Sequence, residues 1–196
     1  MSEEVFQVGK VISASNARFA VACRLLGSQV PTFGSLVKAE SEHGIVILGL
    51  IRDVQLLDDP LIRQIAVLSE ERPELVADQH QRLLPIEVHV QVAGHRCGER
   101  WCHWLPPQPP MTLARIVTCT TGELCSFSER FDYFRLVLES RELLGDELLA
   151  THLRFAGAAR GGQAEHDYLV DAGRELARLL ALDLPRLDAI LRRIRP

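Results

Sequence analysis

The chain has 196 residues, of which 47% are hydrophobic and 24% charged, and its formal net charge is −4. This balance is that of a globular protein with one domain or two small ones, long enough to bury a core without disulfides. The slightly negative charge excludes a strongly basic protein, so direct binding to nucleic acid is not expected.

Residues 1–126 are predicted to form a β domain. Apolar residues alternate with other residues in short segments that are separated by turn-forming residues, which is typical of strands. The first four strands are expected at residues 8–13, 17–23, 36–39 and 45–56. Gly49 interrupts the fourth strand and indicates a bulge or a barrel corner there.

A helical insertion is predicted near residues 60–84. It follows two acidic residues and Pro60, a combination that favours a helix start. The chain then returns to strands at 86–92, 101–105 and 114–119. The proline run at 106–110 cannot form a central strand and is expected to be an extended connector.

Residues 127–196 are predicted to form a helical domain of about four helices. Ser128, Asp146 and Asp183 are the expected caps, and Gly161-Gly162 is the expected break. Four aromatic residues before these helices are expected to join them to the β domain: Phe127, Phe131, Tyr133 and Phe134. The predicted fold class is therefore α+β, with a small N-terminal barrel and a C-terminal helical region.

Five short segments in this order resemble a known family. They are GKVI (9–12), FAV (19–21), VPTFGSLV (30–37), ILGLI (47–51) and LPIEVHVQVAGH (84–95). The chain resembles the HAS-barrel, the small β-barrel at the N-terminus of HerA-type DNA-translocating ATPases and of rotary ATP-synthase subunits. The resemblance covers roughly residues 5–120.

The resemblance implies a platform that assembles or docks partners, because in these ATPases the chemistry belongs to a following domain. No G-x-x-x-x-G-K-[ST] motif for nucleotide phosphates occurs in the chain. We therefore expect a non-catalytic scaffold or adaptor that self-associates or docks a protein partner, although an enzyme of another type stays open. An accessory role in a HerA-type DNA-processing system is an alternative.

The best candidate for a metal site is the tip of the hairpin predicted near residues 94–103. His95, Cys97, Cys102 and His103 supply the two thiolates and two imidazoles that a tetrahedral zinc needs. All four candidate ligands lie within the nine residues from His95 to His103, which leaves little room for a chelate ring, so a redox pair or an ordinary polar loop stays open. Zinc is the only cofactor that the sequence suggests.

The final helix has a basic end. Arg186, Arg192, Arg193 and Arg195 are candidates for contact with an acidic partner or a phosphate. The alternative is that these cations only stabilise the C-terminal end of their helix.

The chain is expected to be cytoplasmic. Its five cysteines are an odd number, and its first residues are acidic rather than basic and apolar. No apolar run is long enough to cross a membrane.

Overall fold

The computed structural model describes residues 5–25, 31–40, 44–56, 84–139 and 145–195. The predicted helical insertion near 60–84, apart from its last residue, lies outside the described residues.

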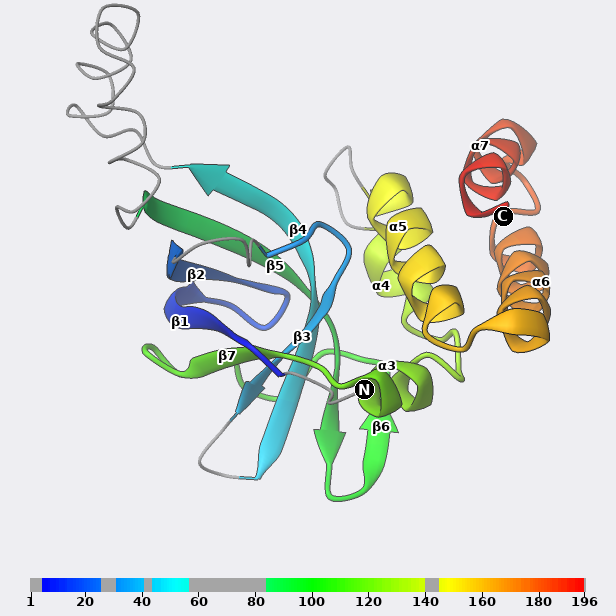
Figure 1. Ribbon diagram of the computed structural model, residues 1–196. Helices are drawn as coiled ribbons and strands as arrows, with labels where there is room; N and C mark the ends of the chain where they lie inside the picture. Colours follow the sequence, from blue (N-terminus) through cyan, green and yellow to red (C-terminus); the bar gives the residue numbers. More distant parts are fainter. Residues whose placement is uncertain (1–4, 26–30, 41–43, 57–83, 140–144, 196) are drawn as a thin grey trace, which may run out of the picture.

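Six antiparallel strands close into a barrel (Figure 1). They are β1 (Gln7–Ala14), β2 (Arg18–Leu25), β3 (Leu36–Glu40), β4 (Ile45–Leu56), β5 (Leu84–Cys97) and β7 (Arg115–Thr118). The order around the barrel is β1-β2-β5-β4-β3-β7, and β7 pairs with β1. A short strand, β6 (Arg100–Cys102), pairs only with the C-terminal end of β5. The predicted barrel is confirmed.

The inside of the barrel is filled by every second residue of its strands. Val21 of β2, Val37 of β3, Ile51 of β4 and Val90 of β5 are completely buried in one cluster. Gly49 also falls on this inward row, and the β4–β5 register shifts between Leu48 and Gly49. The pairing is therefore irregular at this glycine as predicted, although the extra residue, Ala93, belongs to β5 rather than to β4.

The helices follow the last strand. They are α3 (Thr121–Phe127), α4 (Phe134–Leu138), α5 (Gly145–Ala158), α6 (Gly162–Leu179) and α7 (Leu184–Ile194). The predicted helical region is confirmed, with the break at Gly161 and Gly162, where φ is +68° and +54°, and with Asp183 as the cap of α7. Among the described helices, none combines the length and the apolar character needed to cross a membrane.

The start of the helical region differs from the prediction. Ser128 does not begin a helix, because α3 starts earlier and Ser128 stands at its C-terminal cap. Thr120 caps α3 instead: its hydroxyl accepts from the Glu123 backbone N–H at 3.1 Å, and the Glu123 carboxylate accepts from the Thr120 backbone N–H at 3.0 Å. Asp146 lies inside the first turn of α5 rather than before it.

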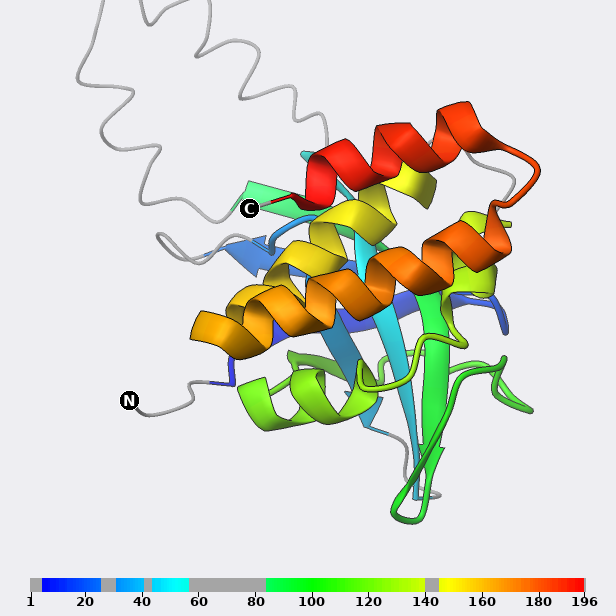
Figure 2. The same cartoon turned by 90° about the vertical axis from the view of Figure 1, so that its right-hand side faces the viewer.

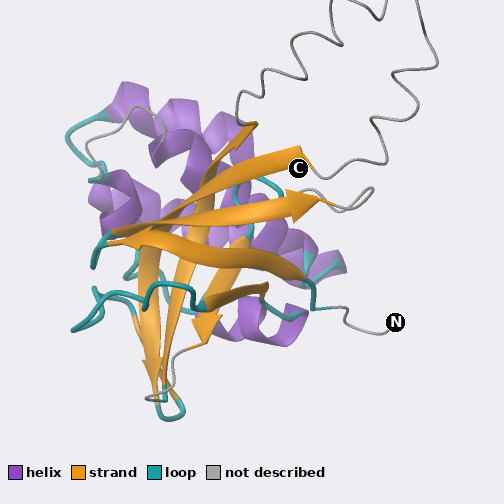
Figure 3. Cartoon of the chain, turned by 90° about the vertical axis from the view of Figure 1, so that its left-hand side faces the viewer, coloured by secondary structure: helices purple, strands orange, loops and turns teal. Residues whose placement is uncertain are grey.

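The helices lie against one side of the barrel (Figures 1 and 3), and a second core of buried side chains joins the two parts. Outward-facing Leu48 and Leu50 of β4 belong to the same buried cluster as Phe127 and Tyr133. The Phe127 and Tyr133 ring centroids are 5.0 Å apart, and the Phe131 and Phe134 centroids are also 5.0 Å apart. The aromatic residues predicted to join the two parts do so.

Candidate functional site

The outermost layer of the protein consists of α6 and α7, which pack on α5 (Figure 2). Helix α7 buries Leu187, Ile190 and Ile194, which lie at helical spacing on one face. Helix α6 buries Leu169, Ala172 and Leu176 in the same way. Both helices therefore turn one apolar face toward α5.

A groove of about 410 Å³ runs between α6 and α7. Its apolar lining is Leu169, Val170, Gly173, Ala177, Leu191 and Ile194. Val170 keeps 37% of its surface exposed, and Ala177 is also exposed. The groove continues into a second hollow of about 620 Å³, which adds Phe155 of α5 and shares Leu169 and Ile194. We call these two hollows together the helical groove.

Arginines surround the helical groove. Arg154, Arg174, Arg193 and Arg195 line it, against one carboxylate, Glu165. Arg174 pairs with Asp171 at 2.7 Å, and Arg193 Nε donates to Glu147 at 2.6 Å. Among the residues that the structure describes, Arg154 and Arg195 form no ion pair. The rim of the helical groove therefore carries an excess of positive charge.

The four arginines predicted to contact a partner have different surroundings. Arg186 binds Asp146 of α5, with Nη2–Oδ1 at 2.6 Å. Arg192 pairs with Asp188 on its own helix at 2.7 Å and is mostly exposed. Only Arg193 and Arg195 line the helical groove. Two of the four arginines therefore lie on the helical groove, and Arg186 instead binds α7 to α5.

The structure brings only two of the four predicted zinc ligands side by side. His95 and Cys102 face each other across β5 and β6, and His95 Nδ1 lies 3.2 Å from the Trp104 carbonyl oxygen. Cys97 is exposed at the tip, two residue pairs farther along the hairpin. No group of three or more His, Cys, Asp or Glu residues that could hold a metal ion occurs in the described part of the chain. The zinc hypothesis stays a prediction.

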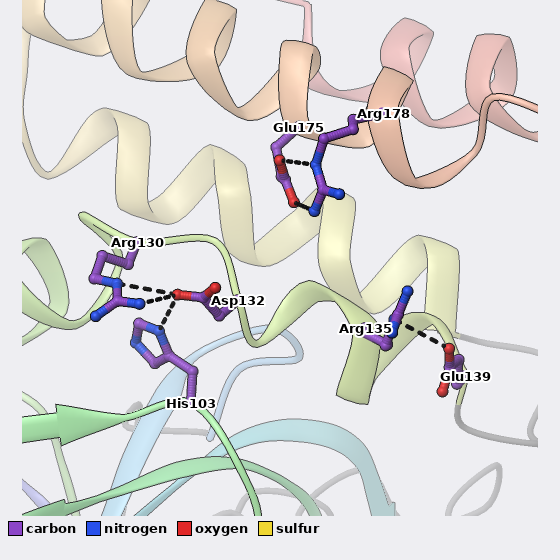
Figure 4. A network of polar contacts seen from close by, with 7 residues as sticks. All are labelled: His103, Arg130, Asp132, Arg135, Glu139, Glu175 and Arg178. Atoms are coloured by element: carbon purple, nitrogen blue, oxygen red, sulfur yellow. Dashed lines mark hydrogen bonds and ion pairs between the residues drawn. The ribbon is translucent and has the colours of Figure 1, made fainter.

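The fourth candidate ligand, His103, fastens the hairpin to the helical region (Figure 4). Its Nε2 lies 3.0 Å from the Phe127 carbonyl oxygen, and its Nδ1 lies 3.6 Å from Asp132, which also pairs with Arg130 at 2.8 Å. Burial lowers the pKa of His103, although the Phe127 carbonyl and Asp132 oppose this effect. Both partners are acceptors, so a neutral His103 can donate to only one of them, and the shorter distance favours donation from Nε2 to the Phe127 carbonyl oxygen.

Two of the cysteines, Cys23 and Cys119, show no sign of an activated thiol. All five are free, and burial raises the pKa of Cys23 and of Cys119. A thiol whose pKa is raised stays protonated and is a poor nucleophile.

No model of a protein family matches the chain, and no curated protein matches it either.

Sequence reasoning missed the helical groove, although a signal was present. Val170, Gly173 and Ala177 follow i, i+3, i+7 spacing, as does the buried face that contains Leu169, Ala172 and Leu176. Two stripes of small or apolar residues on one helix indicate two contact faces. The stripe with Leu169, Ala172 and Leu176 packs toward α5, whereas the stripe with Val170, Gly173 and Ala177 lines the groove.

Proposed function

We propose that the protein is a non-catalytic scaffold or adaptor that docks an amphipathic, acidic segment of a protein partner in the helical groove. The observation that carries this proposal is the second stripe of α6, with Val170 exposed in a groove whose rim is rich in arginine. Exposed apolar surface with a polar rim is typical of interaction sites.

The chemistry of the groove favours an acidic occupant. Leu169, Leu191 and Ile194 offer an apolar floor, into which the apolar face of a helix can pack. Arg154 and Arg195 form no ion pair within the described residues, so acidic residues flanking the apolar face of a bound helix could pair with them. A basic segment would be repelled by the same rim.

The resemblance to HAS-barrel proteins supports the same proposal by another route, since barrels of that family serve as platforms for assembly. An accessory role in a HerA-type DNA-processing system remains the alternative, which salt-dependent binding of DNA by the protein would favour. We place the function in the cytoplasm, in keeping with the five free thiols.

A designed helical peptide tests the docking proposal. A peptide of about 15 residues with a leucine face and a glutamate face should bind saturably in fluorescence anisotropy. Val170→Asp should weaken binding about tenfold or more, because it places a negative charge beside the glutamates of the peptide and removes an apolar contact. Leu182→Asp is the control, since Leu182 is an exposed apolar residue that does not line the groove.

Two results would contradict the proposal. One is equal binding by the same peptide with lysines in place of its glutamates. The other is self-association of the protein that Val170→Asp abolishes, which would assign the groove to a second copy.

A further inference from the structure

A separate hollow of about 360 Å³ lies on the outer wall of the barrel, over β1, β2, β5 and β4. None of its lining residues belongs to the core that the barrel shares with the helices. In Figure 1, β1 and β2 lie on the side of the barrel away from α5 to α7. The hollow is therefore distinct from the helical groove.

Strand register explains why the wall is hollow at this point. Ser13, Ala20, His89 and Asp53 are paired in one row across β1, β2, β5 and β4. Paired residues share a face of the sheet, so the small Ala20 side chain stands among longer polar ones. Ala20 faces outward, yet it is only 5% exposed. Its methyl group thus forms the bottom of a recess with polar walls.

Two β-bulges flank this row. The β1–β2 register shifts between Val11 and Ser13, which leaves Ile12 as the extra residue of β1. The β4–β5 register shifts between Ile51 and Asp53, which leaves Arg52 as the extra residue of β4. A bulge redirects the side chain of its extra residue, and here Arg52 lines the hollow.

Cationic side chains outnumber carboxylates in the lining of the recess. Arg18 and Arg52 line it together with one carboxylate, Glu87, which lies 3.4 Å from His89. The pKa of Arg52 is lowered first by burial and then by the charge of Arg18, while Asp53 acts in the opposite direction. An oxyanion that lies between two neighbouring guanidinium groups can accept hydrogen bonds from both and offset their repulsion.

We propose that this hollow binds an oxyanion group, phosphate or carboxylate, between Arg18 and Arg52, with the Ser13 hydroxyl and His89 as further contacts. The arginine fork matches both kinds of oxyanion in two-point hydrogen bonding. The site does not depend on the helical groove, and it gives the scaffold a place for a small ligand or for an anionic group of a larger one.

Titration with inorganic phosphate, and separately with acetate, tests the proposal by calorimetry at constant ionic strength. Saturable binding of at least one of the two is expected, and the better ligand identifies the preferred oxyanion. Arg18→Gln and Arg52→Gln should each weaken it about tenfold or more, because each removes a charge-assisted hydrogen bond. Arg100→Gln, an exposed arginine at the hairpin tip, should leave binding unchanged.

A third variant keeps the test decisive where Arg52→Gln unfolds the barrel. Ser13 is exposed, so Ser13→Asp should be tolerated by the fold and should weaken oxyanion binding by placing a negative charge in the recess. Absence of saturable binding with both anions overturns the proposal, as does an equal loss of binding in Arg100→Gln. Val170→Asp should bind phosphate normally, which separates this site from the docking groove.

Discussion

Arg186 of α7 grips Asp146 of α5 through two nitrogens, with Nε–Oδ2 at 2.9 Å and Nη2–Oδ1 at 2.6 Å. The same guanidinium donates to the Leu138 carbonyl oxygen at 3.0 Å, at the end of α4. One side chain therefore fastens three helices together. Arg186, which the sequence suggested as a partner contact, instead makes contacts within the fold. These contacts hold α7, which forms one wall of the helical groove, in place.

Removing this contact should loosen α7. Arg186→Gln should lower the free energy of unfolding by roughly 1–2 kcal/mol, since the pair is only partly exposed and makes several charge-assisted hydrogen bonds. Arg192→Gln removes an exposed pair within α7 and should cost less than about 0.5 kcal/mol. Urea unfolding measures both, and equal losses would show that Arg186 is not a special contact.

Two glycines with positive φ offer a matched test of how closely α5 approaches the barrel. Gly34 and Gly44 have φ of +85° and +74°, but only at Gly34 would a Cβ atom meet a neighbour, Thr151 Cγ2 of α5, at 2.7 Å. Gly44→Ala should cost roughly 1–2 kcal/mol from backbone strain alone. Gly34→Ala should cost about 1–3 kcal/mol more from overpacking. Thermal unfolding compares them, and equal costs would place α5 farther from the barrel than described.

His152 should make the protein less stable in acid. It is completely buried, its Nδ1 lies 3.3 Å from the Gly34 carbonyl oxygen, and burial lowers its pKa from 6.5 to about 4. The unfolded chain binds the proton first as pH falls, so the stabilising effect is complete above about 6.5 and is lost progressively down to about 4. The expected loss is on the order of 3 kcal/mol.

Unfolding in urea at a series of pH values checks this. His152→Gln should flatten most of the dependence between pH 4 and 6.5, the range set by its two pKa values, and leave a smaller slope from His103, whose pKa is also lowered. His166→Gln, at an exposed site on α6, is the control and should keep the full dependence. A His152→Gln profile like that of the unaltered protein would show that His152 is not held neutral by burial.

Zinc analysis tests the hairpin. Because His95 and Cys102 lie beside each other while Cys97 and His103 point to other surroundings, we expect purified protein to carry less than one zinc per chain. Cys97→Ser together with Cys102→Ser should leave that zinc content unchanged. Stoichiometric zinc that this double variant loses would show that the tip rearranges to bind the metal.

Most of the barrel could be predicted from the sequence, because an inward face leaves a period of two in each strand. In β5, Ile86, Val88, Val90 and Val92 all point inward and follow that period without a break. Helix α3 was missed because only one of its side chains, Phe127, is fully buried, so it has no apolar stripe. Its capping pair, Thr120 and Glu123, was the available signal.

The oxyanion site and the helical groove were harder to predict for a different reason. A bulge changes the inward spacing in β4 from two residues to three, between Ile51 and Val54, but one such step does not show which strands lie beside it. Arg18 and Arg52 come together only through strand pairings that no local pattern specifies. In the same way, the second stripe of α6 becomes a groove only when α7 lies next to it.

The docking of an acidic amphipathic helix is tested most directly by amide chemical-shift mapping of the full chain with the leucine–glutamate peptide. We expect shift changes at Val170, Ala177 and Leu191 that saturate together, with the amides around Ala20 and His89 on the barrel wall unchanged. Saturating changes centred on the barrel wall, or none on α6 and α7, would contradict it.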